Sequence, residues 1–352
     1  MPEKIKVLVV DDSAFSRQTI KGMLLKAPEV EVVGVAVDGV DAIGKTLRYR
    51  PDIITLDVEM PEMDGFSFLR WLMRERPTPV IMVSSHSDSK TVFKALELGA
   101  VDFVAKPTRR ASFELQKIEN DLLAKVLYID ASSLKRLSRN LRSVSTRRER
   151  KVGPAVPEKY PDRIVAIGAS TGGPQALQLI LTEIPGDFPA PIVISQHMPR
   201  GFTASFSERL NRLSEIQVKE AEDDEPVESG KALICPGGCH LRLIKRGDRV
   251  FTRIRSADEN DRYVPSINLM MESAAEIFNG MTLGVILTGM GNDGAEGMLE
   301  IFKQGGYTIT ESEETAVVFG MPHEVIKAGA ARKVLPLGEV PSELVSMVMR
   351  GK

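Results

Sequence analysis

Short apolar runs alternate with helical patterns along residues 5–128. The runs are rich in Val and Ile and show little in–out alternation, which is typical of parallel strands covered on both faces. Strands alternating with helices favour right-handed βαβ units and a flavodoxin-like, doubly wound sheet of five parallel strands. The predicted strands are Lys6–Val10, Glu31–Val37, Asp52–Leu56, Val80–Val83 and Asp102–Ala105.

A second α/β pattern begins near residue 159 and predicts another domain with a mostly parallel sheet. A helical face recurs over Ser266–Phe278, and the acidic stretch Glu220–Gly230 is expected to be a solvated loop. The predicted strands are Arg163–Gly168, Pro191–Gln196, Ala232–Cys235, Val250–Arg255, Thr282–Thr288, Tyr307–Thr310 and Arg332–Leu335.

A basic segment, residues 135–151, separates the two patterns and runs into a stretch containing Gly153, Pro154 and Pro157. This composition indicates a helical extension followed by a flexible linker. The predicted organisation is a first domain over 1–125, a linker over 126–158 and a second domain over 159–352. The basic segment is interpreted as a solvated connector, with an acidic partner as the alternative.

Composition excludes several classes of protein. The 352 residues are 43% hydrophobic and 27% charged with a net charge of −2, which is typical of a soluble protein and gives no support to nucleic-acid binding. No apolar stretch approaches the roughly 20 residues that span a bilayer, and the N-terminus does not resemble a signal peptide. Cys235 and Cys239 make no disulfide framework, and with His240 they do not complete a metal site. We expect a cytoplasmic monomer without membrane insertion.

Charged side chains end three of the predicted strands in the first domain. Asp11 and Asp12 end the first strand, Asp57 ends the third and Lys106 follows the fifth. The carboxyl ends of parallel strands meet at one edge, where sites of doubly wound sheets form. Carboxylate oxygens suit Mg²⁺, and an Asp carboxylate can accept a phosphoryl group. A single such Asp is better explained as a helix cap or turn residue; the joint placement, with the Ser84 hydroxyl, favours a phosphoryl site.

The motifs of this domain resemble the response-regulator receiver domain over residues 4–125. The resemblance implies that Asp57 accepts phosphate from a histidine kinase and that Asp11, Asp12 and Asp57 hold Mg²⁺. The residues that carry it are Val9-Val10-Asp11-Asp12-Ser13, Leu56-Asp57-Val58-Glu59-Met60-Pro61-Glu62-Met63-Asp64-Gly65 and Ala105-Lys106-Pro107.

The same resemblance makes Ser84 and Phe103 candidates for the hydroxyl–aromatic pair that relays phosphorylation. Lys106 completes the set of switch residues. Ser84 stands where Thr is common in this family, a modest departure from the pattern.

A candidate nucleophile opens the second domain. Gly168-Ala169-Ser170-Thr171-Gly172 fits G-x-S-x-G directly after a predicted strand, so a sharp turn could expose the Ser170 hydroxyl. A dinucleotide loop is the main alternative for these glycines. The spacing is not G-x-G-x-x-G, however, and His197 rather than an acid follows the second strand.

A serine nucleophile needs a base and a group that orients the base. His197 should lie at the same sheet edge as Ser170, and Asp293 follows a later strand in a glycine-rich loop. His240 is the strongest competitor for the base, and the turn-like Asn292-Asp293-Gly294 alone would indicate nothing. The order Ser170, His197, Asp293 differs from that of α/β-hydrolases and indicates a different fold with the same chemistry.

These residues resemble the chemotaxis methylesterase family, CheB, over residues 163–349. The resemblance implies a Ser170-His197-Asp293 triad that hydrolyses glutamate γ-methyl esters of methyl-accepting chemoreceptors, with glutamine deamidation as a second activity. It also implies that the Met290 N–H stabilises the oxyanion, that Thr171 supports the site and that this domain uses no cofactor. The motifs are Ile167–Pro174, Gln196–Pro199, Ala232–His240 and Leu287–Gly294.

Two other classes of function stay open at this point. A receiver-controlled binding module without turnover is the main alternative, and the basic segment 135–151 could make it bind nucleic acid. That reading predicts a helix-turn-helix effector, whereas the second domain is rich in strands. A nucleotide-dependent oxidoreductase is a weaker third option.

Overall fold

The structure is a computed structural model that describes residues 3–84, 89–106, 112–129, 132–134, 136 and 162–349. The chain divides into two compact units between Ser138 and Arg139. The basic segment 135–151 lies outside the described residues apart from Arg136.

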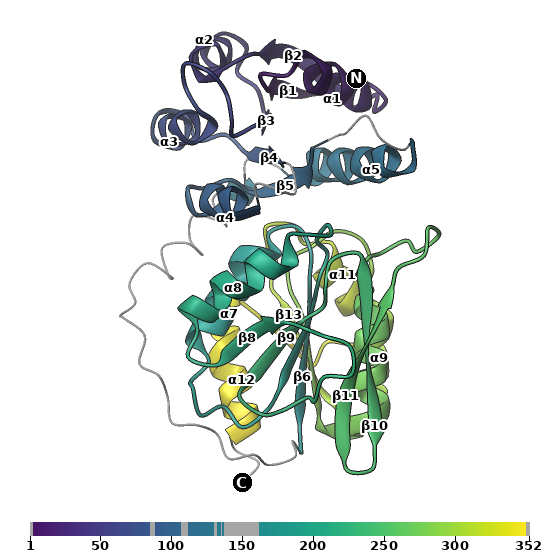
Figure 1. Ribbon diagram of the computed structural model, residues 1–352. Helices are drawn as coiled ribbons and strands as arrows, with labels where there is room; N and C mark the ends of the chain where they lie inside the picture. Colours follow the sequence, from purple (N-terminus) through teal and green to yellow (C-terminus); the bar gives the residue numbers. More distant parts are fainter. Residues whose placement is uncertain are drawn as a thin grey trace. The chain divides into compact units, whose positions relative to one another are not determined.

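The N-terminal unit contains the predicted doubly wound sheet (Figure 1). Its order is β2-β1-β3-β4-β5 and every pairing is parallel. This confirms the flavodoxin-like fold. The order reverses between β1 and β3, so a crevice is expected beyond their carboxyl ends. The strands are β1 Ile5–Val10, β2 Val30–Ala36, β3 Ile53–Leu56, β4 Val80–Ser84 and β5 Asp102–Ala105.

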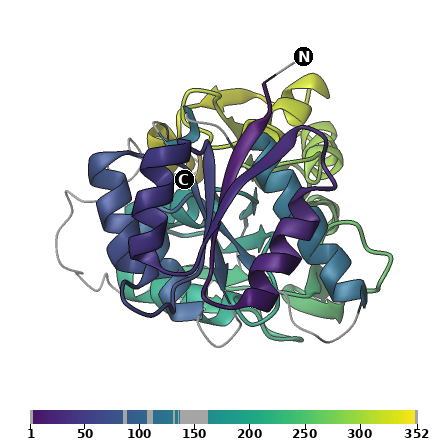
Figure 2. The same ribbon diagram turned by 90° about the horizontal axis from the view of Figure 1, so that it is seen from above.

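Helices cover both faces of this sheet. In Figure 2, α1 and α5 lie on one side and α2 and α3 on the other. Ser13, Asp38 and Asp64 cap α1, α2 and α3, each accepting a backbone N–H of the first turn. Helix α5 passes residue 125, the expected end of the first domain. The helices are α1 Ala14–Leu24, α2 Gly39–Tyr49, α3 Gly65–Glu75, α4 Ser89–Glu97 and α5 Ser112–Tyr128.

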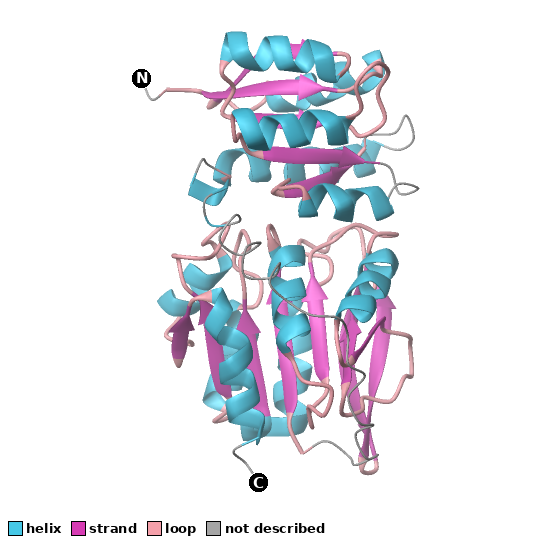
Figure 3. Ribbon diagram, turned by 90° about the vertical axis from the view of Figure 1, so that its left-hand side faces the viewer, coloured by secondary structure: helices cyan, strands magenta, loops and turns pink. Residues whose placement is uncertain are grey.

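The C-terminal unit is built on a parallel sheet of seven strands (Figure 3). Its order is β14-β13-β12-β6-β7-β9-β8. An antiparallel ribbon, β10 paired with β11, lies outside this sheet. The strands are β6 Ile164–Ala169, β7 Ile192–Gln196, β8 Gln217–Glu220, β9 Lys231–Ile234, β10 Cys239–Arg246, β11 Arg249–Ser256, β12 Thr282–Ile286, β13 Tyr307–Glu311 and β14 Lys333–Leu335.

The helices of the C-terminal unit form two groups. Helices α7, α8 and α12 lie on one side of the sheet, and α9 and α11 lie on the other (Figure 1). Helix α10 packs against α9 and α11. The helices are α7 Gly173–Glu183, α8 Thr203–Leu213, α9 Ile267–Phe278, α10 Ala295–Lys303, α11 Met321–Lys327 and α12 Val340–Met349, with short 3₁₀ turns at Asn279–Met281 and Leu337–Glu339.

Two strands were absent from the sequence prediction. β8 is a short edge strand whose residues are mostly polar, so it has no apolar run to reveal it. β10 lies in the ribbon and alternates buried with exposed positions less regularly than a period of two requires. Both therefore lack the continuous apolar pattern that marked the central strands.

The sheet brings three distant loops to one edge. β6 pairs with β7 on one side and with β12 on the other, so the order in which strands are added to the sheet reverses beside β6. Ser170 follows β6, His197 follows β7 and Asp293 lies in the loop between β12 and α10. In a doubly wound sheet this is where a ligand site is expected.

Helix α9 is pressed closely against β6. A Cβ atom added to Gly168 would lie 2.4 Å from Ile267 Cγ2 and 2.8 Å from Ile286 Cδ1. Only glycine allows this approach, which fixes the first turn of α9 beside the end of β6.

Among the residues that the structure describes, none of the helices is both long and apolar enough to cross a membrane.

Gly168→Ala should destabilise the C-terminal unit by about 1–3 kcal/mol, because the new methyl group overpacks this contact. Urea unfolding, followed by hydrogen exchange on peptides of that unit, measures the change. Gly338→Ala is the matched control, since its added Cβ meets nothing within 4 Å. Equal stability of both variants and the parent protein would contradict the packing argument.

Candidate functional site

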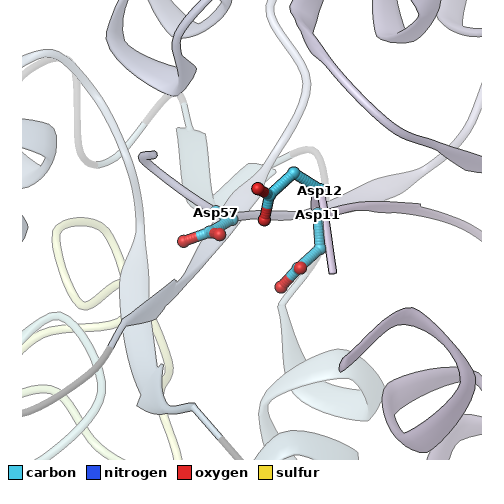
Figure 4. Close-up of side chains that lie close together, drawn as sticks. All are labelled: Asp11, Asp12 and Asp57. Carbon is cyan, nitrogen blue, oxygen red and sulfur yellow. The ribbon is translucent and has the colours of Figure 1, made fainter. Parts of the chain in front are cut away.

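Three acidic side chains gather at the carboxyl edge of the N-terminal sheet (Figure 4). Asp11 and Asp12 follow β1, and Asp57 follows the neighbouring strand β3. One carboxylate oxygen from each lies within 4.8 Å of the other two. Asp11 and Asp57 are buried whereas Asp12 is exposed. An all-oxygen set of this kind fits a hard divalent cation that keeps some of its water.

Lys106 joins the two buried acids. Its Nζ lies 2.5 Å from Asp57 Oδ2 and 3.3 Å from Asp11 Oδ2. The other Asp57 oxygen accepts the Val58 N–H at 2.8 Å, and Asp11 Oδ2 accepts the Ser16 hydroxyl at 2.6 Å. The predicted acids and lysine are therefore brought together by the fold.

The charged groups at this edge shift one another's pKa values. Burial raises the pKa of Asp57 to about 6, although its hydrogen bond and attraction to Lys106 act in the opposite direction. Burial acts to lower the pKa of Lys106, but Asp57 and Asp11 outweigh it and hold that pKa above its usual value. Lys106 therefore remains a cation beside the acids, where a phosphoryl group would also carry negative charge.

Ser84 and Phe103 occupy neighbouring strands close to this edge. Ser84 is the buried last residue of β4, and its carbonyl accepts the Lys106 N–H at 2.7 Å. Phe103 is buried in β5 and packs edge-on against Phe93, with ring centroids 6.4 Å apart. Lys125 of α5 donates to the Phe103 carbonyl at 2.5 Å. Both predicted switch residues thus lie within the core, and Phe103 contacts two helices.

In the C-terminal unit, Ser170 is fixed by bonds to two neighbouring strands. Its N–H donates to the Thr288 carbonyl beyond β12 at 3.0 Å, and its carbonyl accepts the Gln196 side-chain amide of β7 at 2.9 Å. The His197 N–H donates to the Ala169 carbonyl at 3.0 Å, so His197 lies beside the residue that precedes Ser170. Ser170 is 8% exposed.

His197 and Asp293 form a direct pair. The Nε2 atom of His197 lies 2.8 Å from Asp293 Oδ2, although the two residues are far apart in the sequence. The other ring nitrogen, Nδ1, does not face Asp293 and can bond to a different group. The arrangement of the three residues therefore has the elements of a nucleophile, a base and an orienting carboxylate.

Asp293 is buried against the first turn of α9. Its Oδ2 accepts the Ile267 N–H at 2.7 Å and its Oδ1 accepts the Asn268 N–H at 3.0 Å. Burial opposes ionisation, but the hydrogen bond and charge of His197 and these two amides lower the pKa of Asp293 below its usual value. A helix N-terminus favours a negative charge, so the carboxylate is kept ionised at neutral pH.

Tyr263 is a site residue that the sequence analysis did not identify. Its ring stacks on the His197 imidazole, with centroids 5.3 Å apart and planes 5° from parallel. The Tyr263 hydroxyl donates to Asn292 Oδ1 at 3.0 Å, next to Asp293. Nothing in the local pattern distinguishes Tyr263 from any other loop tyrosine, so only the fold identifies it.

The loop with Met290 is adjacent to Ser170. A Cβ atom at Gly289 would lie 2.6 Å from the Ser170 Cβ, so only glycine permits this close approach. Met290 follows directly and is partly exposed. The Thr288 hydroxyl donates to the Thr171 carbonyl at 2.8 Å, which ties the Ser170 turn to the same loop.

His240, the alternative base, has both ring nitrogens engaged. Its Nε2 lies 2.8 Å from Asp261 Oδ2, and its Nδ1 accepts the Ser266 N–H at 3.0 Å. The residue is only 2% exposed. These bonds leave no ring nitrogen to receive a proton from a nucleophile, which favours His197 as the base.

Glu311 is a second residue that the sequence analysis missed. It ends β13, is fully buried and accepts the Thr288 N–H at 2.8 Å and the Thr315 hydroxyl at 2.9 Å. It therefore supports the loop that contacts Ser170. An acid at the end of a strand, the signal that identified Asp57, could have identified Glu311 as well. The predicted strand ended at Thr310, and Glu311 was therefore not considered.

Comparisons with known proteins identify the class of both units. Residues 7–117 match the family described as Response regulator receiver domain, and residues 165–344 match the family described as CheB methylesterase. The solved catalytic domain of Thermotoga maritima CheB methylesterase is 46% identical, with a TM-score of 0.52, over 53% of this chain and 98% of that domain. The protein is thus a response regulator with a methylesterase domain.

Full-length relatives narrow the class further. The protein-glutamate methylesterase/protein-glutamine glutaminase 3 of Geobacter sulfurreducens is 48% identical, and the match covers 97% of each chain. The Pyrococcus horikoshii protein-glutamate methylesterase/protein-glutamine glutaminase is 42% identical over 99% of this chain and 95% of its own. The chain belongs to the protein-glutamate methylesterase/protein-glutamine glutaminase family, which confirms the family prediction.

The buried Glu311 predicts a pH-dependent stability. Burial raises its pKa to about 7 from an ordinary value of 4.5, while its hydrogen bonds from Thr288 and Thr315 act in the opposite direction. Folding therefore favours the neutral acid. The contribution of the neutral Glu311 side chain to the stability of the fold is complete below about pH 4.5 and is lost as the pH rises through about 7.

The effect of Glu311→Gln on the free energy of unfolding of the C-terminal unit should therefore be more stabilising at pH 8 than at pH 4.5. The difference between the two pH values should be up to about 3 kcal/mol. Urea unfolding at the two pH values, followed by hydrogen exchange on peptides of this unit, measures the difference. The exposed Glu313→Gln is the matched control. A Glu311→Gln effect that is the same at both pH values would contradict the neutral-acid account.

Proposed function

We propose that the protein is a cytoplasmic, phosphorylation-regulated esterase that removes methyl groups from glutamate γ-methyl esters of chemoreceptors and deamidates receptor glutamines. The observation that carries the proposal is the 2.8 Å His197–Asp293 pair on the strand edge that also presents Ser170. The names of the full-length relatives support this choice of substrate.

Acylation begins at Ser170. Its Oγ attacks the ester carbonyl carbon while His197 takes the hydroxyl proton through Nδ1, the nitrogen that does not face Asp293. Asp293 stabilises the imidazolium that forms. It remains ionised because of its hydrogen bond and attraction to His197 and because it accepts the two α9 amides. His197 then returns the proton to the departing methoxide, and methanol leaves a glutamyl ester on Ser170.

The oxyanion of each tetrahedral intermediate is assigned to the Met290 N–H. This loop contacts Ser170 through Gly289, which supports the assignment. Thr171 has a supporting role, because its carbonyl bond to the Thr288 hydroxyl fixes the turn against the loop. A preorganised donor of this kind is worth about 3 kcal/mol of transition-state stabilisation.

Deacylation repeats the chemistry with water as the nucleophile. His197 takes a proton from the water, which attacks the acyl carbon, and returns it to Ser170 Oγ. The products are a receptor glutamate and free enzyme. With a glutamine substrate the same first step releases ammonia, for which proton transfer from His197 is essential because an amide anion is a very poor leaving group.

The receiver unit would accept a phosphoryl group on Asp57. A carboxylate oxygen attacks the phosphorus of the phosphohistidine in a histidine kinase, the P–N bond breaks and an aspartyl phosphate forms. Asp11, Asp12 and Asp57 would hold Mg²⁺, which supplies charge compensation during phosphoryl transfer. Lys106 would pair with a phosphoryl oxygen, as it pairs with Asp57 here.

Ser84 and Phe103 would relay the modification. The Ser84 hydroxyl would donate to a phosphoryl oxygen, and Phe103 would repack beside it. Phe103 contacts Phe93 of α4 and Lys125 of α5, which supports a route from the phosphorylated edge to both helices. Phosphorylation would then shift the population towards the active esterase.

Ser170→Ala should reduce methanol release from methylated receptor membranes by at least about 10³-fold, since no other group forms the acyl-enzyme. Gas chromatography of released methanol measures the rate. Ser342→Ala, an exposed serine on α12, is the matched control and should retain the parent rate. Turnover by a folded Ser170→Ala protein would exclude this nucleophile.

Asp57→Asn should abolish the stimulation of methanol release by a small phosphodonor such as acetyl phosphate. The ratio of rates with and without phosphodonor should fall to one, and chelation of Mg²⁺ should have the same effect on the parent protein. Asp52→Asn is the control, because Asp52 lies at the opposite end of β3 and binds the Lys6 N–H. Persistent stimulation of Asp57→Asn would place the phosphoacceptor elsewhere.

A further inference from the structure

A second histidine–aspartate pair lies in the C-terminal unit. His240, near the start of β10, donates from Nε2 to Asp261 Oδ2 at 2.8 Å. The same Asp261 oxygen accepts the Asp258 N–H at 2.7 Å. His240 is 2% exposed, whereas the Asp261 side chain is 27% exposed.

The hydrogen bonds determine the tautomer of His240. A backbone N–H can only donate, so the Ser266 N–H at 3.0 Å requires an unprotonated Nδ1. The ring proton therefore lies on Nε2 and points at Asp261. One neutral imidazole is therefore hydrogen-bonded to both the middle and the end of the segment 257–266, which connects β11 to α9.

The proposed catalytic residues are contacted by Tyr263 of this segment and by the first two residues of α9, which follow it. Tyr263 stacks on the His197 ring at 5.3 Å, with the planes nearly parallel. At the end of the segment, Ser266 caps α9, and the next two amides, those of Ile267 and Asn268, hold the Asp293 carboxylate at 2.7 and 3.0 Å. His197 is therefore contacted by a residue of the segment, and Asp293 is contacted by the two residues that directly follow it.

We propose that His240 is a positioning residue for the hydrolase: it holds the 257–266 segment so that α9 orients Asp293 and Tyr263 orients His197. The inference rests on the proposed function, because it assigns His240 an effect on that reaction. His240 does not touch the substrate. It acts through the Ser266 amide, which is one residue from the first amide bonded to Asp293.

The Ser266 bond matters more for the reaction than the Asp261 bond. It fixes the residue at which α9 begins, whereas the Asp261 bond holds the more exposed middle of the segment. Small displacements of catalytic groups cost up to about 10²-fold in rate. A shifted α9 should therefore lower kcat, while KM, which depends on groups that bind the receptor, should change little.

Three substitutions separate the two bonds. His240→Leu removes both, His240→Asn can place an acceptor oxygen near the position of Nδ1, and His240→Gln can place a donor near the position of Nε2. Methanol release should show kcat lowered by about tenfold or more in His240→Leu, with KM within about twofold. His240→Asn should recover most of kcat, and His240→Gln should not.

Thermal unfolding separates positioning from general stability. Asn and Gln each keep one of the two bonds, so similar melting temperatures with different kcat values support positioning. Asp224→Asn is the matched control, since Asp224 pairs with Arg246 of the same ribbon at 2.6 Å and the pair is exposed. It should retain the parent kcat.

Failure of this inference is distinguishable from failure of the proposed function. A parent protein that releases no methanol refutes the proposed function. An active parent whose His240→Leu variant keeps kcat within twofold overturns the positioning role. If His240→Leu does not fold, the Asn and Gln variants decide, and equal kcat in those two variants overturns the inference.

Discussion

The hydrogen bond between His197 and Asp293 is the interaction on which the C-terminal site depends. It joins two loops that follow different strands, and it requires a carboxylate that stays ionised although it is buried. A buried carboxylate without partners would take up a proton instead. The hydrogen bond and charge of His197, together with the amides of Ile267 and Asn268, prevent this. Because two of these partners belong to α9, the position of α9 is a chemical requirement as well as a packing one.

The packing around this bond follows from that requirement. Gly168 allows α9 to approach β6, and Gly289 allows the Met290 loop to approach Ser170. Thr288 links that loop to Thr171 through its hydroxyl and to the buried Glu311 through its amide. The Ser170 turn and the Met290 loop are therefore connected through a few short contacts, and the helix that holds the Asp293 carboxylate packs beside them.

Both units place their chemistry at the same kind of location. In the N-terminal sheet the order reverses between β1 and β3, and Asp11 and Asp57 follow these strands. In the C-terminal sheet β6 is flanked by β7 and β12, which precede His197 and Asp293. The arrangement follows from parallel strands whose carboxyl ends share one edge. The two sites differ because one gathers acids and a lysine, and the other pairs an imidazole with one acid.

The sequence predicted the central strands and the residues at their ends, because buried parallel strands are continuous apolar runs and a polar residue after such a run is conspicuous. It could not predict Tyr263 or the α9 amides around Asp293. Those contacts depend on where a connecting segment packs, which has no periodic signal. Edge strand β8 was missed for a related reason: three of its four residues are polar, and only Val218 is fully buried, so it has no apolar run.

Reaction with a fluorophosphonate, followed by mass spectrometry of the labelled peptide, shows whether Ser170 is a nucleophile that His197 activates. We expect one covalent adduct, on Ser170, formed at least about 100-fold more slowly when His197 is replaced by Gln. An adduct on another serine, or labelling of Ser170 at an unchanged rate without the imidazole, would contradict this expectation.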